Sequence, residues 1–410
     1  MDEFGSRIQH SDTPTYRIVP FLWAGDGLGY SLLFPCNTTA MPASTVVTRD
    51  YVEGQVKDNT TRQAMLCPWV HTDLTHIDTD QQEPGLEFWQ SARQSESLPD
   101  TAANIPPLPS DRAIKVYSEY PFINQNLSHP RFSMTDNMAD ADILWLSSHF
   151  KEFLEFSKET PEKRINQFPG ENVITIKDML CAVVRRIDKK HLPVTYNLVT
   201  ELPQFVSYYQ KLEKEEEDTH FIVKPWNLAR GLDMQVCKDL KHILRLPASG
   251  PKIAQKYLHN PVLFNREELG WVKFDIRYIV LLSSVEPLKV FAYNRFWLRF
   301  ANIPFSLEKL DLYEKHFTVM NYTDTNLKQM FCHDFIKLFE CQNPGFAWEK
   351  VEADIFKMIR AVFDGATKNP PPAGMGHSEQ SGAMYATDLM LNWELDEKGN
   401  KVTEDGRFHT

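Results

Sequence analysis

The sequence predicts an α+β protein built from two parts. Short apolar runs separated by turn residues fill roughly the first hundred positions, whereas strand-like and helix-like runs alternate after a proline-rich stretch from Ser91 to Arg112. The first pattern is typical of β-hairpins and the second of helices layered on a sheet. With 42% hydrophobic residues among 410, the chain can bury a substantial core. We expect a β-rich region at 1–100, a linker at 101–112 and a second domain at 113–410.

A hairpin is the clearest element near the N-terminus. Two apolar runs, 16–23 and 30–34, flank the turn residues Gly25, Asp26 and Gly27. Glycine favours tight hairpin turns because it adopts positive φ without steric cost. The glycine spacing is not G-x-G-x-x-G and no helical pattern follows, so the sequence favours a plain turn over a nucleotide-binding loop.

The region after residue 112 predicts several further elements. We expect a charged run to form a solvated helix end, and a segment rich in Pro, Gly and Ser to form a mobile loop. The predicted strands are Ala113–Tyr117, Asp142–Leu146 and Phe221–Val223; the predicted helix is Ile176–Arg186, the charged run is Lys211–Asp218 and the loop is Asn369–Gly382.

Composition excludes several classes of protein. A net charge of −11 argues against general binding to nucleic acid or anionic lipid. The sequence shows no membrane-spanning run and no signal-peptide pattern at its start, which favours a cytosolic or nuclear location. The six scattered cysteines form no C-x-x-C pair, so we expect reduced and mostly buried thiols. H-E-x-x-H, G-x-S-x-G and G-x-x-x-x-G-K-[ST] do not occur, which excludes zinc proteases, α/β-hydrolases and P-loop NTPases.

The stretch 272–280 holds the most informative group of candidate functional residues. Its alternation places Lys273, Asp275 and Arg277 on one face of a predicted strand and apolar side chains on the other. A turn at 284–287 then leads into a second apolar strand at 288–293. On pattern alone, an ordinary solvated sheet face is the simpler hypothesis. However, residues 252–299 hold eight Lys and Arg against four Asp and Glu, and this net charge of +4 in an acidic chain would attract phosphates or an acidic peptide.

Several motifs together resemble the tubulin-tyrosine ligase family. They occur in the family's order and approximate spacing, and the resemblance covers about 115–393. Residues 1 to about 100 look like the later part of the SET-like β domain that precedes the ligase region in some relatives, so we expect a chain that is incomplete at both ends. The motifs are Phe221-Ile-Val-Lys-Pro-Trp-Asn-Leu-Ala-Arg-Gly231, Ala254-Gln-Lys-Tyr-Leu258, Lys273-Phe-Asp-Ile-Arg277, Trp297-Leu-Arg-Phe-Ala-Asn302 and Met384-Tyr-Ala-Thr-Asp-Leu-Met-Leu391.

The resemblance implies an ATP-grasp fold that uses ATP and Mg²⁺ to join an amino acid to a protein carboxylate. Transferred position by position, it assigns Lys224 to the phosphates, with Lys273 and Asp275 also at the nucleotide. It assigns Arg277 and Arg299 to the acceptor carboxylate or an acidic tubulin tail, which suits the guanidinium fork. The implied adenine hinge is Gln255, Lys256, Tyr257 and Leu258, and the implied metal ligand is Asp388, on a strand that turns Leu389 and Leu391 to the opposite side.

Three departures from the family pattern argue against catalysis. The phosphate loop, 226–233, is bulky and ends in an acid, where active relatives have a glycine-rich R-G-x-G loop. The family's H-L-T-N is replaced by His316-Phe-Thr-Val, with Asn321 two residues further on. The E-x-N that completes the family's Mg²⁺ shell does not follow the Asp388 strand, and Glu404 lies among residues that do not match.

The leading hypothesis is therefore a tubulin-binding, catalytically degenerate ligase relative that regulates the tyrosination or glutamylation of tubulin. The first alternative is an active ATP-dependent ligase that adds an amino acid to a tubulin tail. The second is a SET-like module associated with histones or chromatin. We expect a monomer that binds neither nucleic acid nor membrane directly, located in the cytoplasm with microtubules or centrosomes and also in the nucleus.

Overall fold

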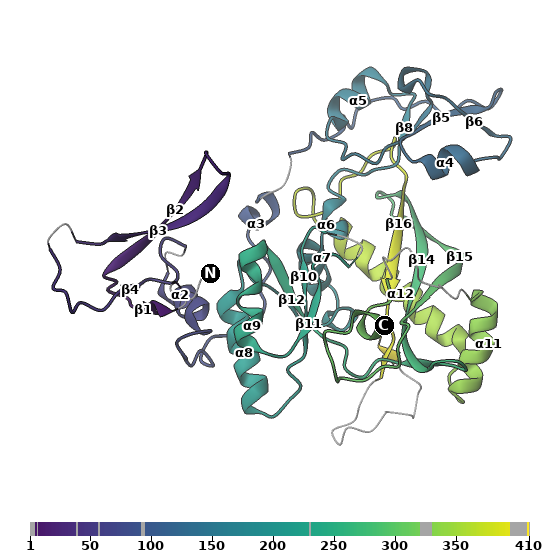
Figure 1. Cartoon of the computed structure of the whole chain (residues 1–410). Coiled ribbons are helices and arrows are strands. Elements are labelled where there is room, and N and C mark those ends of the chain that lie inside the picture. Colours follow the sequence, from purple (N-terminus) through teal and green to yellow (C-terminus); the bar gives the residue numbers. More distant parts are fainter. Residues whose placement is uncertain are drawn as a thin grey trace. The chain divides into compact units, whose positions relative to one another are not determined.

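The computed structural model describes residues 5, 7–37, 40–55, 58–91, 95–228, 231–319, 330–393 and 408–409 (Figure 1). The chain divides into two compact units. One consists of Met1–Asp80, Tyr196–Thr219 and Cys237–Ala254, and the other of Gln81–Thr195, His220–Val236 and Gln255–Thr410. Helices occur together with both parallel and antiparallel strands in the described part of residues 113–410, so the α+β prediction is confirmed.

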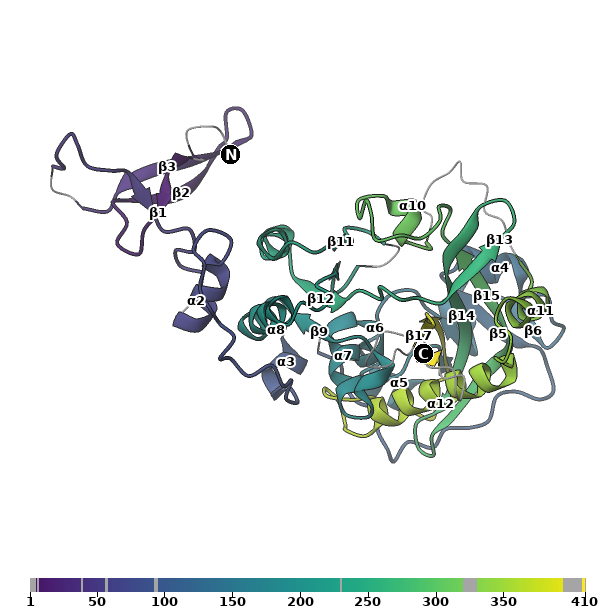
Figure 2. The same cartoon turned by 90° about the horizontal axis from the view of Figure 1, so that it is seen from below.

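The first unit begins with the predicted hairpin. Strands β2 (Tyr16–Trp23) and β3 (Leu28–Pro35) pair antiparallel, and Gly27 takes φ +70° in the turn (Figure 2). Helix α2 starts where the Asp58 side chain accepts a hydrogen bond from the Thr61 main chain, a standard N-cap. The remaining elements of this unit are β1 (Gln9–His10), β4 (Thr48–Arg49), α2 (Asn59–Leu66), α8 (Leu202–Lys214), α9 (Leu240–Ile243) and a 3₁₀ turn at Leu246–Ser249.

A parallel sheet opens the second unit. Its order is β6-β5-β7-β8, and every pair in it is parallel. The predicted strands at 113–117 and 142–146 are confirmed as β5 and β7. The elements here are α3 (Leu86–Gln90), β5 (Ile114–Ser118), α4 (Pro121–Asn126), β6 (Phe132–Met134), a 3₁₀ turn at Met138–Asp140, β7 (Ile143–Trp145), α5 (Phe153–Glu159) and β8 (Arg164–Ile165).

A second four-stranded sheet has the order β11-β10-β12-β9. The predicted helix at 176–186 is α7, and the predicted strand at 221–223 is β10. The charged run at 211–218 begins in the last turn of α8 and continues beyond it, as predicted. The elements are α6 (Asn172–Thr175), α7 (Lys177–Arg185), a 3₁₀ turn at Lys189–His191, β9 (Thr195–Asn197), β10 (Phe221–Pro225), β11 (Gln235–Cys237) and β12 (Lys252–Lys256).

The third sheet contains the two strands that hold most of the predicted site residues. The long strand β14 (Gly270–Ser284) pairs antiparallel with β13 (Leu263–Arg266), β15 (Lys289–Phe300) and β16 (Ala383–Leu389). The two strands predicted at 272–280 and 288–293 are thus confirmed, and both extend further than the apolar pattern indicated. The remaining elements are α10 (Tyr313–His316), α11 (Cys332–Gln342), α12 (Trp348–Thr367), β17 (Asn392–Trp393) and β18 (Phe408–His409).

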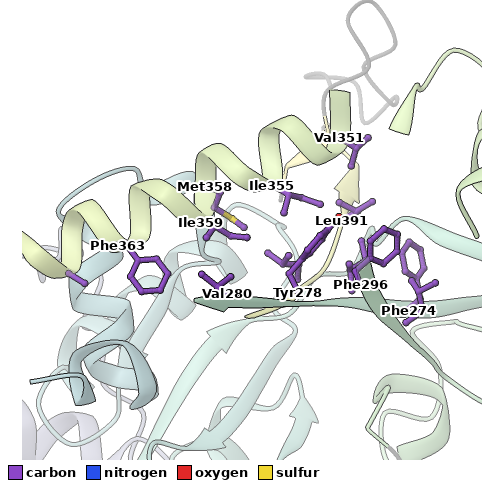
Figure 3. Packing of buried hydrophobic residues seen from close by; sticks show 14 of the residues in the cluster. Phe274, Tyr278, Val280, Phe296, Val351, Ile355, Met358, Ile359, Phe363 and Leu391 are labelled. Atoms are coloured by element: carbon purple, nitrogen blue, oxygen red, sulfur yellow. The ribbon is translucent and has the colours of Figure 1, made fainter. Parts of the chain in front are cut away.

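Helix α12 packs on one face of this sheet (Figure 3), and α11 contributes to the same core. Helix α12 presents apolar side chains at three- and four-residue intervals, which places them on a single helical face. These side chains meet the inward residues of β14 and β15, and Phe335 of α11 stacks on Phe264 with ring centroids 5.1 Å apart. The α12 residues are Val351, Ile355, Met358, Ile359 and Phe363. This core covers one face of β14, and the charged residues Lys273, Asp275 and Arg277 lie on the opposite face.

Two expectations need correction. The segment 369–382 lacks regular structure, as predicted, but it is packed into the molecule and not an exposed loop. Met375 and Gln380 are buried, and the Gln380 amide donates to the Thr160 and Lys163 carbonyls. All six cysteines are free thiols, but only three of them, Cys67, Cys181 and Cys237, are buried. In the part of the chain that the structure describes, we find no helix with the length and apolar character needed to span a membrane.

Candidate functional site

Two lysines lie at the centre of the candidate site. Lys273, on β14, is 2% exposed. Burial lowers its pKa to about 7; the nearby Lys224 lowers it further, while Asp275 acts in the opposite direction. Lys224, on β10, is half-buried, and desolvation lowers its pKa to about 8. Within the described residues neither ammonium forms an ion pair with a carboxylate.

Each lysine is instead held by a neutral oxygen. Lys224 Nζ donates to Gln255 Oε1 at 2.6 Å, and Gln255 Nε2 donates to Thr195 Oγ1 at 3.0 Å. Lys273 Nζ donates to the Tyr257 hydroxyl at 2.8 Å and lies 4.2 Å from the centre of the Tyr257 ring. Gln255 and Tyr257 are two residues apart on and just after β12, so alternation turns both side chains towards the lysines.

The Tyr257 hydroxyl continues into a short relay. It lies 2.9 Å from Nδ1 of His316, whose pKa is lowered to about 4, chiefly by burial. A neutral imidazole accepts at one nitrogen and donates at the other. His316 Nε2 lies 3.2 Å from the Lys309 carbonyl, so the network assigns the proton to Nε2 and makes Tyr257 the donor to Nδ1.

The predicted adenine hinge, residues 255–258, has few polar groups left to bind an adenine base. The Gln255 side chain is committed to Lys224 and Thr195, and the Lys256 ammonium lies 5.2 Å from the centre of the Phe221 ring. Tyr257 donates its main-chain N–H to the His220 carbonyl. Leu258 makes no main-chain hydrogen bond to another described residue, so its peptide groups are the hinge atoms that an adenine could meet.

Acidic and guanidinium groups alternate further along the same face of the sheet. Asp275 faces Arg299 and Arg277 faces Asp388 in the strand register. Arg299 Nε donates to Asp275 Oδ1 at 2.7 Å, and the Thr318 hydroxyl donates to Oδ2. Asp275 is 4% exposed, and its burial raises its pKa even though Arg299 acts to lower it. The solvated-face hypothesis is therefore wrong for Lys273 and Asp275, because β12 and the 305–318 segment cover this end of the strand.

Both oxygens of Asp388 are already occupied. Arg277 donates to Oδ1 at 2.7 Å and to Oδ2 at 2.8 Å, and Arg299 Nη2 lies 2.9 Å from Oδ2. Partial burial raises the pKa of Asp388, but the hydrogen bonds from the two arginines outweigh it and leave the pKa below the ordinary value. As predicted, Leu389 and Leu391 point the opposite way and are buried.

The residues present fit ATP better than they fit Mg²⁺. The two lysines supply buried positive charge that no described carboxylate neutralises, which suits a polyphosphate. Among the described residues no group of three His, Cys, Asp or Glu lies close enough to hold a metal ion. Asp388, the predicted ligand, would have to exchange its arginine partners for the metal. Asn321, Glu404 and Arg230, which entered the sequence argument, lie outside the described residues.

One cation was missed by the sequence analysis. Lys177, the first residue of α7, contributes to lowering the pKa of Lys224 and donates from Nζ to the Leu228 carbonyl in the predicted phosphate loop. Burial lowers its own pKa. Nothing in the local sequence marks Lys177, because its proximity to Lys224 arises from folding.

Comparison with known proteins identifies the relatives of this chain. The pattern of the Tubulin-tyrosine ligase family matches residues 156–398, and that of the Tubulin tyrosine ligase SET-like domain matches residues 1–73. Tubulin--tyrosine ligase-like protein 12 of Homo sapiens is 47% identical over 413 residues, which cover 98% of this chain and 63% of the relative. The Mus musculus protein of the same name is 46% identical over 411 residues, covering 98% and 64%.

More distant matches include Tubulin polyglutamylase ttll-4 of Caenorhabditis elegans, 27% identical over 213 residues, which cover 50% of this chain and 33% of that protein. This chain spans under two thirds of the length of the human and mouse relatives. The family pattern nevertheless matches more than half of this chain and includes every predicted site residue. The chain belongs to the tubulin-tyrosine ligase family.

Proposed function

We propose that this chain binds tubulin and ATP and regulates the modification of tubulin by occupying it, without completing the ligation itself. The observation that carries the proposal is the contrast between the two ends of the site. At one end, Lys224 and Lys273 are buried without a carboxylate partner. At the other end, the Asp388 carboxylate forms ion pairs with Arg277 and Arg299.

The lysine end supports nucleotide binding. Burying an ammonium costs several kcal/mol unless a partner compensates, and the lowered pKa values express that cost. A bound triphosphate would place negative charge next to both ammonium groups and so offset this free-energy cost. The relatives named for tubulin ligation or polyglutamylation support tubulin as the protein partner.

The arginine end supports a loss of catalysis. Phosphoryl transfer depends on neutralising phosphate charge, which in this family class requires carboxylate oxygens free for Mg²⁺. In the described part of the chain, Asp275 and Asp388 instead accept hydrogen bonds from arginine and threonine partners. We expect the protein to act in the cytoplasm on microtubules or centrosomes, with a further nuclear population. The histone-associated alternative stays a prediction.

Titration calorimetry with ATP, with and without Mg²⁺, tests the nucleotide part. We expect binding that weakens at least about tenfold in Lys224→Met and is unchanged in Lys158→Met, which alters an exposed lysine on α5. Binding that is insensitive to Lys224 would refute the nucleotide site.

Turnover separates the two ligase-related hypotheses. We expect no tubulin-dependent ATP hydrolysis above background, together with co-sedimentation of the chain with microtubules or retention on immobilised tubulin. The active-ligase alternative has one specific observation in its favour, since Lys273, Asp275, Arg277, Arg299 and Asp388 gather on one sheet face. Hydrolysis that requires tubulin and is lost in Asp275→Ala would establish that alternative and overturn the proposal.

A further inference from the structure

The outward side of β15 carries an unusual series of side chains. Alternate positions along the strand are cationic or aromatic, whereas Phe296, Leu298 and Phe300 between them point into the core. We call the outward residues the β15 strip; they are Lys289, Phe291, Tyr293, Arg295, Trp297 and Arg299. A bulge opposite Ile279 adds two residues to β15, which leaves this alternation intact.

The strip is exposed and continues onto neighbouring strands. Phe291 lies opposite Leu281 of β14, which lies opposite Met384 of β16, and the Tyr293 and Trp297 rings stack with centroids 6.3 Å apart. These five apolar side chains are between 38% and 56% exposed. Contiguous exposed apolar groups of this kind mark interaction sites, because single exposed residues are common but rows of them are not.

The strip is also positively charged. Lys289 and Arg295 are exposed, and neither forms an ion pair with another residue that the structure describes. Arg299 and Arg277 share Asp388 and Asp275 and so are largely neutralised within the site. The free charge of the surface therefore comes from two cations spaced between the aromatic side chains.

Strand β15 can accept another strand. Among the described strands β15 pairs only with β14, so no described strand occupies its other edge. An extended peptide added there would place alternate side chains next to the strip, about 6.8 Å apart, as cross-strand neighbours. Carboxylates would then lie opposite Lys289 and Arg295, and apolar side chains opposite Phe291, Tyr293 and Trp297.

We propose that the β15 strip binds an extended acidic peptide segment whose outward side chains follow the order acidic, apolar, apolar, acidic, apolar, to match Lys289, Phe291, Tyr293, Arg295 and Trp297. The inference rests on the proposed function in one respect, namely that the partner is an acidic protein tail. It does not depend on the binding of ATP, because none of the exposed strip residues contacts Lys224 or Lys273.

The test uses a fluorescently labelled peptide of about a dozen residues whose successive outward-facing positions are Glu, Phe, Phe, Glu and Phe, with Thr between them. Fluorescence anisotropy measures its affinity for the whole chain. We expect saturable binding that weakens at least about tenfold in the double variant Phe291→Thr, Tyr293→Thr and, separately, in Arg295→Glu. Peptides with Phe changed to Ser, or Glu changed to Lys, should bind at least about tenfold more weakly.

Matched controls keep the outcome specific. Phe122→Ser removes an exposed aromatic side chain on α4, and Lys337→Glu makes the same kind of charge reversal on α11, which covers the other side of the sheet. Both should bind the peptide as the unaltered chain does, and circular dichroism should show that all variants are folded. Equal losses in the controls, or no strip-dependent binding, would overturn the proposal. So would sedimentation showing a dimer that the strip variants abolish, because a second copy would then occupy the face.

Titration of the same variants with ATP separates this inference from the proposed function. Unchanged ATP affinity with lost peptide binding supports both. Peptide binding without any ATP binding would refute the nucleotide part of the proposed function and leave the β15 strip in place.

Discussion

Binding of ATP should draw protons from solution at alkaline pH. In the free protein Lys273 has a pKa of about 7 and Lys224 a pKa of about 8, both lowered mainly by burial. A triphosphate placed against both ammonium groups would favour their charged forms and raise both pKa values again. Groups that were deprotonated before binding must then take up protons as the nucleotide enters.

The size of this uptake follows from the two pKa values. At pH 8 Lys273 is about 90% deprotonated and Lys224 about half, so full protonation on binding takes up about 1.4 protons. At pH 9 the same arithmetic gives about 1.9 protons. ATP itself contributes little, because its phosphate groups are already ionised at these pH values.

Calorimetry in buffers of different ionisation enthalpy measures the uptake directly as the slope of the observed enthalpy. We expect the slope at pH 8 to fall to about 0.5 in Lys273→Met and to stay unchanged in Lys158→Met. In Lys224→Met it should fall below about 0.9, because loss of Lys224 also removes one cause of the lowered Lys273 pKa. ATP binding accompanied by fewer than about 0.3 protons at pH 8 would contradict the reasoning. It would show that the phosphates do not meet these two lysines, whatever the affinity.

Three further predictions concern the framework around the site. Burial raises the pKa of Glu171 from 4.5 to about 7. The stability that the neutral Glu171 carboxyl gives the fold is therefore fully present below pH 4.5 and is lost as the pH rises through about 7. Glu171→Gln should therefore raise the free energy of unfolding by about 2–3 kcal/mol at pH 8 and leave it unchanged near pH 4.5, as urea titrations at both pH values would show; equal effects at both would contradict it. Gly374→Ala should destabilise the fold by at least about 2 kcal/mol, because its Cβ would lie 1.9 Å from the Asn369 carbonyl oxygen; an unchanged melting temperature would refute this packing. Phe335→Ala, at the centre of the aromatic core beneath β14, should cost about 3–5 kcal/mol in urea unfolding, and a loss below about 1 kcal/mol would show that the cluster does not form.

Local sequence predicted the strands of the site well, for a physical reason. Alternation with period two is a property of neighbouring residues, so the two faces of β14 were assigned correctly from the chain alone. The same pattern could not show what covers a face. It favoured a solvated surface for Lys273 and Asp275, which the structure buries beneath Tyr257 and Thr318.

Contacts between distant segments account for what the pattern missed. Arg277 and Asp388 are 111 positions apart, and Tyr257 and His316 are 59 apart, so neither pair leaves a local signal. The family resemblance supplied the site residues individually, but it did not indicate that the acids and arginines would pair with one another. Lys177 illustrates the same limit, since only folding brings it to the loop at Leu228.

The pairing of Asp388 with two arginines bears directly on how this site differs from a working ligase. A guanidinium fork satisfies both carboxylate oxygens at once, and its charge lowers the pKa of the acid, so the pair is stable without a metal. The same pairing engages Arg277 and Arg299, the residues that the family resemblance assigns to the acceptor carboxylate. A single interaction thus weakens the metal site and the acceptor site together, while the lysines, which lie beyond Asp275, keep their capacity for phosphate. The proposed function therefore treats nucleotide binding and catalysis as separable, since loss of the metal site would not remove the two lysines.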